Sequence, residues 1–515
     1  MNRTLPSSPL PFLRAHGAAL FSLAYLLLLL PFLAKNRLLG LDESIYANVA
    51  LAATRDGHGL RFYFEGSPFF EKPPLGIWLQ ALSMRLFGMG EWGVRLPSAM
   101  AAAAVLYFVW RLAARIGRNE LAGFLTVGLL ATSEHFLLFS RVASLDMMLT
   151  LCLMGSWWET LQAFENTGVE AERHLRRLGL WLAAGLLVKS FFALAFLLPA
   201  LLAFTVSRGK HRPLGRSLIL AGGPPLLALA LWFAGYAAIY GKAFFTWELG
   251  SNLTFRLVTG DLGRLWRPAD IEFHAWQLYA ELARNGMAFI WPLLPMGLVA
   301  WGKEARTGLP RRQADAALLS GFTILVLYGF LVLVAIRPLI NYLMPLTVLS
   351  VLALAALWRK PPCLKTSWVL AATFLLALAN GFARHALTGE KLLAACILAF
   401  ALWNVPGTKP HHLGRRLRLA AILLLLAGAL WKAIPYTMHP PDPNGKWVAA
   451  VREHPPVRKG EILLFYGDPV EARVLRFYCD YDVRWTQETP LPRPREAMLF
   501  EYNQVVHFLP AMNDN

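Results

Sequence analysis

Long apolar runs separated by short clusters of Lys and Arg occupy most of this chain, and they restrict its fold more than any other feature. A helix needs roughly 17–25 mostly apolar residues to cross a bilayer. Runs suited to this lie at 17–34, 97–114, 121–139, 145–165, 217–240, 287–302, 316–336, 339–358, 367–385, 391–404 and 418–434. A soluble chain that is 56% hydrophobic and 16% charged would have too little polar surface to cover itself. The pattern therefore predicts an all-α polytopic membrane protein.

One further apolar run, residues 178–206, is too long for a single membrane span and short for two. Basic clusters lie at both of its ends, and short cytoplasmic loops carry an excess of Lys and Arg. If both clusters are cytoplasmic, the run crosses the membrane twice, with its outer tip near Val188-Lys189-Ser190. The predicted total is then about thirteen transmembrane helices.

The same basic clusters predict the orientation of the chain. With the N-terminus in the cytoplasm, every basic loop is cytoplasmic, whereas residues 35–96, 140–144, 241–286 and 436–515 face outward. We therefore expect a transmembrane domain over residues 1–435. The outer loops 35–96 and 241–286 are expected to lie together on its outer side.

The tail, residues 436–515, has a different pattern and is predicted to be a small extracytoplasmic α/β domain. Helix-like KWVAAVREH and PVEARVLRFYC alternate in it with strand-like EILLFY and QVVHFL. These segments suit a small sheet with helices packed on it.

Charge, cysteine content and the N-terminus exclude several other classes of protein. The net charge of +18 comes from clusters between apolar runs rather than from one face or tail, so no nucleic-acid partner is indicated. The four cysteines are scattered, which supports neither a disulfide framework nor a thiolate metal site. No small-residue cleavage site follows the first apolar run, which we interpret as a retained span rather than a signal peptide.

Ionisable and polar side chains recur where the apolar runs are predicted to reach the outer face. A charge at membrane depth costs a few kcal/mol, so each such residue is a functional candidate. The candidates on this side are Asp42, Glu43, Glu71, Lys72, Arg141, Asp146, Lys189, His274 and Tyr342. Glu134 and His135, inside the third run, are further candidates that belong to no motif.

Most of these residues also have a purely structural interpretation. Asp42 can cap the helix predicted after it, which a short acceptor side chain does well. Lys72 and Arg141 can be interfacial anchors that extend to lipid headgroups. Asp146 can pair with Arg141 or Lys189 simply to satisfy a buried charge. The sequence leaves these alternatives open for each residue taken alone.

The grouping of acids with cations favours a function. His274 and Tyr342 can still be ordinary aromatic-belt residues. Pro73 and Pro74, however, stiffen the backbone directly after Lys72 and hold that lysine on a fixed loop. Such a site can bind a phosphate on a cation while a carboxylate removes a proton.

Five motifs occur in order along about the first 350 residues: LDESIYA at 41–47, FFEKPPLGIW at 69–78, GEWGVRLPSA at 90–99, SRVASLDMML at 140–149 and INYLMPL at 340–346. Together they resemble the GT-C membrane glycosyltransferases of the protein O-mannosyltransferase and aminoarabinose transferase type. This resemblance implies the GT-C fold, with a transmembrane catalytic domain over residues 1–435 in the inner (plasma) membrane. The outer loops 35–96 and 241–286 are then expected to form its active-site side. The expected sugar donor is of the undecaprenyl-phosphate (polyprenyl-phosphate) type. Transfer to a lipid, glycan or protein acceptor on the outer face, among membrane lipids, is also implied.

The resemblance also implies roles for individual residues. Asp42 matches the catalytic carboxylate, which acts as base on the acceptor or steers it, and Asp146 matches the family's second acid. The residues expected to bind substrate are Glu43, Lys72, Arg141, Lys189 and Tyr342. Glu71 and His274 match positions of a divalent-metal site, although two ligands make an incomplete set.

The chain departs from the motifs of this family at two places, and two other functions are alternatives to a transferase. The aminoarabinose enzymes carry an arginine where this chain has Ile45, and many relatives have Lys-Gly-Pro at Lys189-Ser190-Phe191. A transporter or lipid flippase would also place charges in a cavity, but transporters tend to show paired repeats, and only one hairpin is evident here. A non-catalytic scaffold gives no reason for an acid–cation cluster drawn from four outer segments.

Overall fold

The computed structural model describes residues 10–35, 37–39, 42–56, 61–64, 66–117, 120–131, 133–189, 214–247, 343–355, 445–453, 462–466, 469–478, 482–486, 496–502 and 505–509. The chain divides into two compact units. The first, called the helical unit, contains Met1–Leu28, Met100–Ser140 and Leu145–Pro435. The second, called the mixed unit, contains Leu29–Ala99, Arg141–Ser144 and Tyr436–Asn515.

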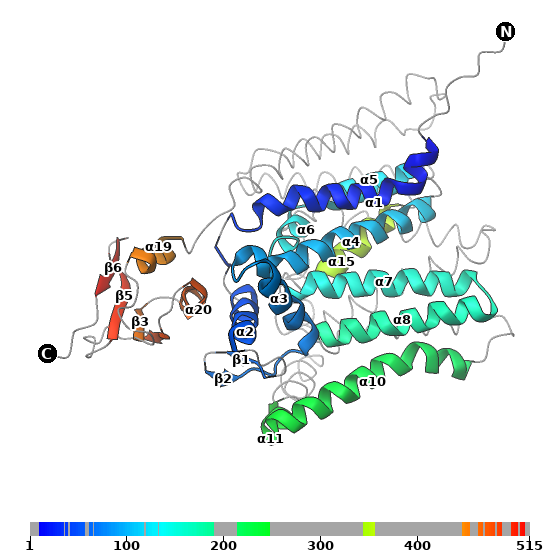
Figure 1. The fold of residues 1–515 in the computed structure, drawn as a ribbon. Coiled ribbons are helices and arrows are strands. Elements are labelled where there is room, and N and C mark those ends of the chain that lie inside the picture. Colours follow the sequence, from blue (N-terminus) through cyan, green and yellow to red (C-terminus); the bar gives the residue numbers. More distant parts are fainter. Residues whose placement is uncertain are drawn as a thin grey trace, which may run out of the picture. The chain divides into compact units, whose positions relative to one another are not determined.

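The described part of the helical unit consists of helices (Figure 1). They are α1 (Leu10–Leu29), α4 (Glu91–Gly117), whose first residues belong to the mixed unit, α5 (Glu120–Ala131), α6 (Glu134–Phe139), α7 (Leu145–Glu165), α8 (Gly168–Lys189), α10 (Leu214–Tyr240), α11 (Lys242–Phe245) and α15 (Met344–Leu354). Helix α8 lies between α7 and α10, and it packs against both (Figure 1).

Glycines let these three helices approach closely. A Cβ atom at Gly155 of α7 would lie 2.4 Å from the Trp181 ring of α8. A Cβ at Gly179 of α8 would lie 2.8 Å from the carbonyl oxygen of Leu220 on α10. Small residues at helix contacts are the usual means of close packing between membrane helices.

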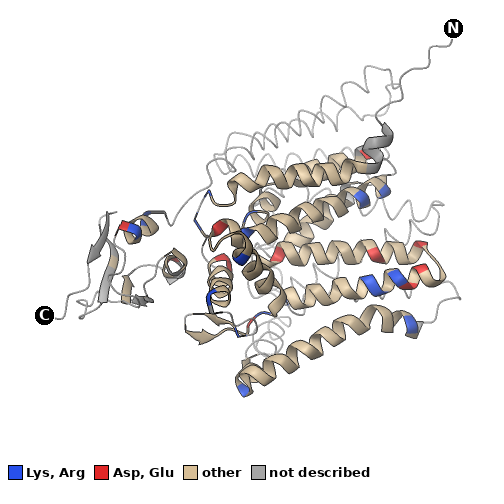
Figure 2. Cartoon of the chain, in the orientation of Figure 1, with Lys and Arg blue, Asp and Glu red and all other residues tan. Residues whose placement is uncertain are grey.

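Most of the Lys, Arg, Asp and Glu residues of α7, α8 and α10 lie toward one end of these helices (Figure 2). Arg216, near the start of α10, donates a 2.9 Å hydrogen bond to Glu172, near the start of α8. The starts of α8 and α10 therefore lie at the same end of the helical unit, as the predicted double crossing of 178–206 requires. Residues 190–213 of that crossing lie outside the described residues.

The described helices overlap the apolar runs expected up to residue 240 and around 344–354. The third run is interrupted, because α5 ends at Ala131 and α6 begins after Ser133, whose Oγ accepts a hydrogen bond from the Phe136 N–H at 3.4 Å. By length and composition, two described helices are suited to crossing a membrane, Glu91–Gly117 and Gly215–Tyr240. The runs 287–302, 316–336, 367–385, 391–404 and 418–434 lie outside the described residues.

The mixed unit contains α2 (Asp42–Asp56), β1 (Tyr63–Phe64), β2 (Ser67–Pro68), α3 (Pro74–Phe87), α19 (Gly445–Glu453), β3 (Ile462–Tyr466), α20 (Pro469–Tyr478), β4 (Asp482–Thr486), β5 (Glu496–Tyr502) and β6 (Val505–Leu509). Helix α2 packs against α3 and α20. The strands of the tail form one sheet in the order β4-β3-β5-β6, with β3 parallel to both neighbours and β5 antiparallel to β6.

A small apolar core holds the tail elements together. It consists of Trp447, Val448, Val451, Leu463, Phe465, Ala472, Leu475, Val483 and Leu499. Helices and strands form at the four segments that were expected to be regular, and β4 and β5 are additional strands that the sequence reading missed. The mixed unit joins this tail with residues from the first predicted outer loop, so the domain boundary expected near residue 435 remains a prediction.

Candidate active site

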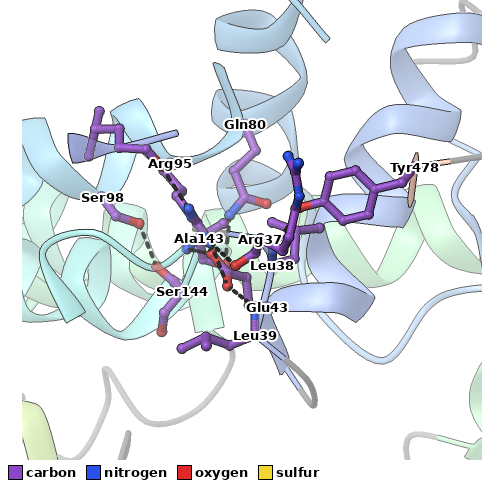
Figure 3. A network of polar contacts seen from close by, with 11 residues as sticks. Arg37, Leu38, Leu39, Glu43, Gln80, Arg95, Ser98, Ala143, Ser144 and Tyr478 are labelled. Carbon is purple, nitrogen blue, oxygen red and sulfur yellow. Dashed lines mark hydrogen bonds and ion pairs between the residues drawn. The ribbon is translucent and has the colours of Figure 1, made fainter. Parts of the chain in front are cut away.

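Glu43, the second residue of α2, is the centre of a buried polar network in the mixed unit (Figure 3). Its side chain is buried, and both carboxylate oxygens accept hydrogen bonds. Oε1 accepts from Arg95 Nε at 2.7 Å and from the Ala143 N–H at 2.8 Å. Oε2 accepts from the Leu39 N–H at 2.6 Å and from Arg95 Nη2 at 3.1 Å. A buried ion pair is tolerated when its hydrogen bonds are complete, and this one joins α2, α4 and the turn 141–144.

Arg95 also fixes the chain that leads into α2. The guanidinium donates to the carbonyl oxygen of Leu33 at 2.7 Å and to that of Arg37 at 2.9 Å. Nearby on α4, the Trp92 indole donates to the Leu30 carbonyl oxygen at 3.0 Å. Side chains of one helix therefore satisfy backbone groups along the segment before α2, which restricts its position.

The turn 141–144 is held by side chains from three helices (Figure 3). Ser98 Oγ of α4 donates to the Ser144 carbonyl oxygen at 3.1 Å, and Gln80 Nε2 of α3 donates to the Ala143 carbonyl oxygen at 3.3 Å. Glu43 of α2 accepts the Ala143 N–H, as described above. Arg141, at the start of this turn, is buried. Hydrogen bonds with Ser98, Gln80 and Glu43 thus hold the backbone directly after Arg141, the cation predicted from the sequence.

Asp42 is the first residue of α2 and is half-buried. The Tyr46 hydroxyl, one turn further along the helix, donates to Asp42 Oδ2 at 3.4 Å. A carboxylate is favourable in the first turn of a helix, where the backbone N–H groups and the helix dipole are positive. This geometry suits both the structural and the catalytic interpretation of Asp42.

Lys72 and Glu71 lie just before α3, where Lys72 is half-buried and Glu71 exposed. Pro73 is the N-cap residue of α3, with φ −61° and ψ 160°, and Pro74 is the first helical residue. Proline is well suited to this place, because its missing N–H would have no helical partner there. Both prolines thus lie at the start of α3, directly after Lys72, and their role in holding that lysine on a fixed loop stays a prediction.

The structure does not test the predicted metal site of Glu71 and His274. Among the described residues, no group of three or more His, Cys, Asp and Glu side chains is arranged to hold a metal ion. His274, the partner expected for Glu71, lies outside the described residues, as does Tyr342. The metal site therefore remains a prediction.

The helical unit contains a second buried ion pair, formed by Asp146 and Lys189. Asp146 stands in the first turn of α7, Lys189 is the last residue of α8, and both side chains are at most 3% exposed. The Lys189 ammonium donates directly to Asp146 Oδ1. Each charge also suits the dipole of its own helix terminus. Of the alternatives left open for Asp146, the structure confirms pairing with Lys189.

Other polar residues in the network were not assigned from the sequence. Arg95 lies inside the motif GEWGVRLPSA, and an arginine at the edge of an apolar run was the signal for it. Tyr46 lies inside LDESIYA.

The two candidates without a motif lie in α6. His135 is buried and hydrogen-bonded through Nδ1 to Thr347 Oγ1 at 2.8 Å. Glu134 begins α6, and its side chain lies outside the description.

Part of the chain is similar to known membrane glycosyltransferases. The family model described as dolichyl-phosphate-mannose-protein mannosyltransferase matches residues 71–234. Undecaprenyl phosphate-alpha-4-amino-4-deoxy-L-arabinose arabinosyl transferase from Pseudomonas aeruginosa strain UCBPP-PA14 is 31% identical over 219 residues, 40% of this chain and 38% of that protein. The enzyme of the same name from Yersinia enterocolitica serotype O:8 is 30% identical over 207 residues, 39% of this chain and 37% of that protein. The match thus spans less than two fifths of these relatives' length.

Solved structures are similar over nearly the whole chain. The crystal structure of ArnT from Cupriavidus metallidurans bound to undecaprenyl phosphate has a TM-score of 0.66 and 18% identity, and covers 92% of this chain and 87% of that one. Its apo state has a TM-score of 0.63 and 17% identity, with the same coverage. The chain thus shares the fold of these structures. Its resemblance to the GT-C membrane glycosyltransferases of the protein O-mannosyltransferase and aminoarabinose transferase type is confirmed.

Proposed function

We propose that the chain is an integral-membrane glycosyltransferase. It transfers a sugar from a polyprenyl-phosphate donor, of the undecaprenyl-phosphate type, to a lipid, glycan or protein acceptor at the extracytoplasmic face of the inner membrane. The observation that carries this proposal is the buried Glu43–Arg95–Ala143 network, which fixes the segment entering Asp42 and the turn beginning with Arg141. The fold shared with a structure bound to undecaprenyl phosphate supports the donor class.

In this proposal Asp42 is the general base. Its carboxylate accepts the proton of the acceptor hydroxyl while that oxygen bonds to the anomeric carbon of the sugar. The bond between the anomeric carbon and the phosphate oxygen breaks, and polyprenyl phosphate leaves with the electron pair. Lys72 and Arg141, which belong to the same unit as Asp42, bind this phosphate and stabilise its growing charge. Base catalysis of this kind contributes typically 10²–10⁴-fold.

Asp146 and Lys189 remain part of the proposal as a supporting pair in the helical unit. Each holds the other in a defined rotamer, and a fixed lysine is suited to binding an anionic lipid headgroup. Tyr342 keeps its proposed role in lining the donor site. The membrane orientation inferred from the basic clusters, with a cytoplasmic N-terminus and an extracytoplasmic tail, completes the proposal.

Purified protein in lipid nanodiscs, supplied with a panel of undecaprenyl-phosphate sugars and candidate acceptors, tests this function. We expect consumption of one donor and release of undecaprenyl phosphate. Asp42→Asn keeps the shape of the side chain and loses only the interaction of its charge with the helix dipole, about 0.3–1 kcal/mol, so its melting temperature should be close to that of the wild type. Its turnover should fall by about 100-fold or more.

Two outcomes would count against the proposal. Near-normal turnover in Asp42→Asn would exclude Asp42 as the base. Movement of a labelled polyprenyl-phosphate lipid between leaflets, without sugar transfer to any acceptor, would instead favour a transporter.

A further inference from the structure

Tyr478, the last residue of α20 in the tail, contacts the segment that leads into α2 (Figure 3). Its hydroxyl oxygen accepts a hydrogen bond from the Leu38 N–H at 2.7 Å. The Arg37 guanidinium lies over the Tyr478 ring, 5.4 Å from its centroid, and pairs with Glu91 at 3.1 Å. All these residues belong to the mixed unit.

Three consecutive residues before α2 are each held by a different side chain. Arg95 binds the carbonyl oxygen of Arg37, Tyr478 binds the N–H of Leu38, and Glu43 binds the N–H of Leu39. Leu38 is fully buried, so its N–H needs a protein partner. The central contact of the three comes from a residue 440 positions further along the chain.

The Tyr478 phenol is suited to a lasting hydrogen bond. Burial, together with the nearby Glu91 carboxylate, raises the pKa of the phenol above its usual range. The hydroxyl therefore stays protonated and neutral at physiological pH. A neutral hydroxyl accepts the Leu38 N–H without placing a charge beside the buried Glu43–Arg95 pair.

We propose that Tyr478 is a positioning residue, through which the tail sets the backbone at Leu38 and thereby the orientation of the Asp42 carboxylate. Asp42 begins its helix four residues after Leu38, and Glu43 and Arg95 fix the backbone on either side of the same contact. The catalytic consequence rests on the proposed function, whereas the restraint on Leu38 does not. The tail thus helps to orient the catalytic carboxylate, although no catalytic role is proposed for its own residues.

Tyr478→Phe tests the proposal, because it removes the hydroxyl and keeps the ring that packs under Arg37. Amide hydrogen exchange at Leu38, read by mass spectrometry, should become about tenfold faster, the effect expected from losing one net hydrogen bond. Donor turnover should fall by a similar factor while the KM for the donor stays within about twofold, since the phosphate contacts are untouched. In an Asp42→Asn background, the same change should cause no further loss of turnover.

Tyr63→Phe is the matched control. Tyr63 belongs to the same unit and lies in β1, outside the segment that leads into α2. It should change neither exchange at Leu38 nor turnover. Unchanged exchange at Leu38 in a folded Tyr478→Phe protein would overturn the proposal.

Two further results separate this proposal from the proposed function. A Leu38 amide that exchanges at the rate of an unprotected loop in the folded wild type would overturn the restraint without any variant. Faster exchange with unchanged turnover would overturn the link to Asp42. If the wild type transfers no sugar, the proposed function fails, and exchange at Leu38 still decides whether Tyr478 holds this segment.

Discussion

The two adjacent acids at the start of α2 have different surroundings, and this difference assigns them different roles. Glu43 is buried and accepts four hydrogen bonds from three residues, which occupies the lone-pair positions of a carboxylate. Asp42 is only half-buried, at the first position of the same helix, and the Tyr46 hydroxyl donates to it at 3.4 Å. We therefore propose that Glu43 positions the site, in place of the substrate contact expected from the sequence, and that Asp42 meets the acceptor.

Replacing Glu43 should affect stability far more than replacing Asp42. Glu43→Gln keeps the shape but removes the carboxylate that is hydrogen-bonded to the buried Arg95 guanidinium, and it turns an amide N–H₂ toward backbone donors. Removing one partner of a buried ion pair costs about 3–5 kcal/mol. Thermal unfolding of the purified variant in detergent should show this loss, whereas Asp42→Asn should melt close to the wild type.

Glu172→Gln is a suitable control for that measurement. Its partner Arg216 is 64% exposed, so the ion pair is screened by solvent. Exposed pairs of this kind contribute about 0–1 kcal/mol. Equal losses in Glu43→Gln and Glu172→Gln would show that the buried network does not stabilise the fold as argued.

At the scale of elements, helices with long apolar runs were predictable and contacts between distant residues were not. The break in the third run at Ser133 is a local capping event inside apolar sequence, which periodicity does not detect. Strand β4 reads DVRWT and is only five residues long, and strand formation depends on neighbouring strands. The motifs located Asp42 and Lys72, but Arg95 and Tyr478 act on residues 52 and 440 positions away.

The hairpin of α7 and α8 gives a test of the second ion pair. Lys189→Met should destabilise the protein by about 3–5 kcal/mol, because it removes the cation that pairs with the buried Asp146. Adding Asp146→Leu should recover part of that loss, so the double variant is more stable than the sum of the single variants predicts. If Lys189 also binds the donor, the stable double variant will transfer no sugar. Strictly additive losses would contradict the pairing.

Packing within the same hairpin gives an independent prediction. Gly155→Ala places a Cβ against the Trp181 ring, and overpacking of this kind costs typically 1–3 kcal/mol. Gly222→Ala on α10 is the matched control, because no heavy atom lies within 4 Å of a Cβ there. Alanine favours a helix over glycine by about 0.5–1 kcal/mol, so the control should melt at an equal or higher temperature. Melting curves of both variants decide the point.

For the whole molecule, the hydrogen bond between Leu38 and Tyr478 restricts the possible membrane topologies of the chain. The Leu38–Tyr478 hydrogen bond joins the first predicted outer loop to the tail within one unit. Two segments that share a hydrogen bond must lie on the same side of a bilayer. The number of crossings between residues 96 and 436 must therefore be even. Besides residues 178–206, ten apolar runs are predicted to cross in this part of the chain, so the total is even only if residues 178–206 cross twice.

This constraint gives a prediction for two reporters read in the same cells. Ser67, in β2, is exposed, so Ser67→Cys in a background without the four native cysteines should react with a membrane-impermeant thiol reagent added from outside. A phosphatase that is active only outside the cytoplasm should be active when fused to the C-terminus. Both signals on the outer side fit the orientation inferred from the basic clusters. Both on the cytoplasmic side would reverse the orientation and keep the contact, whereas one signal on each side is incompatible with the Leu38–Tyr478 bond.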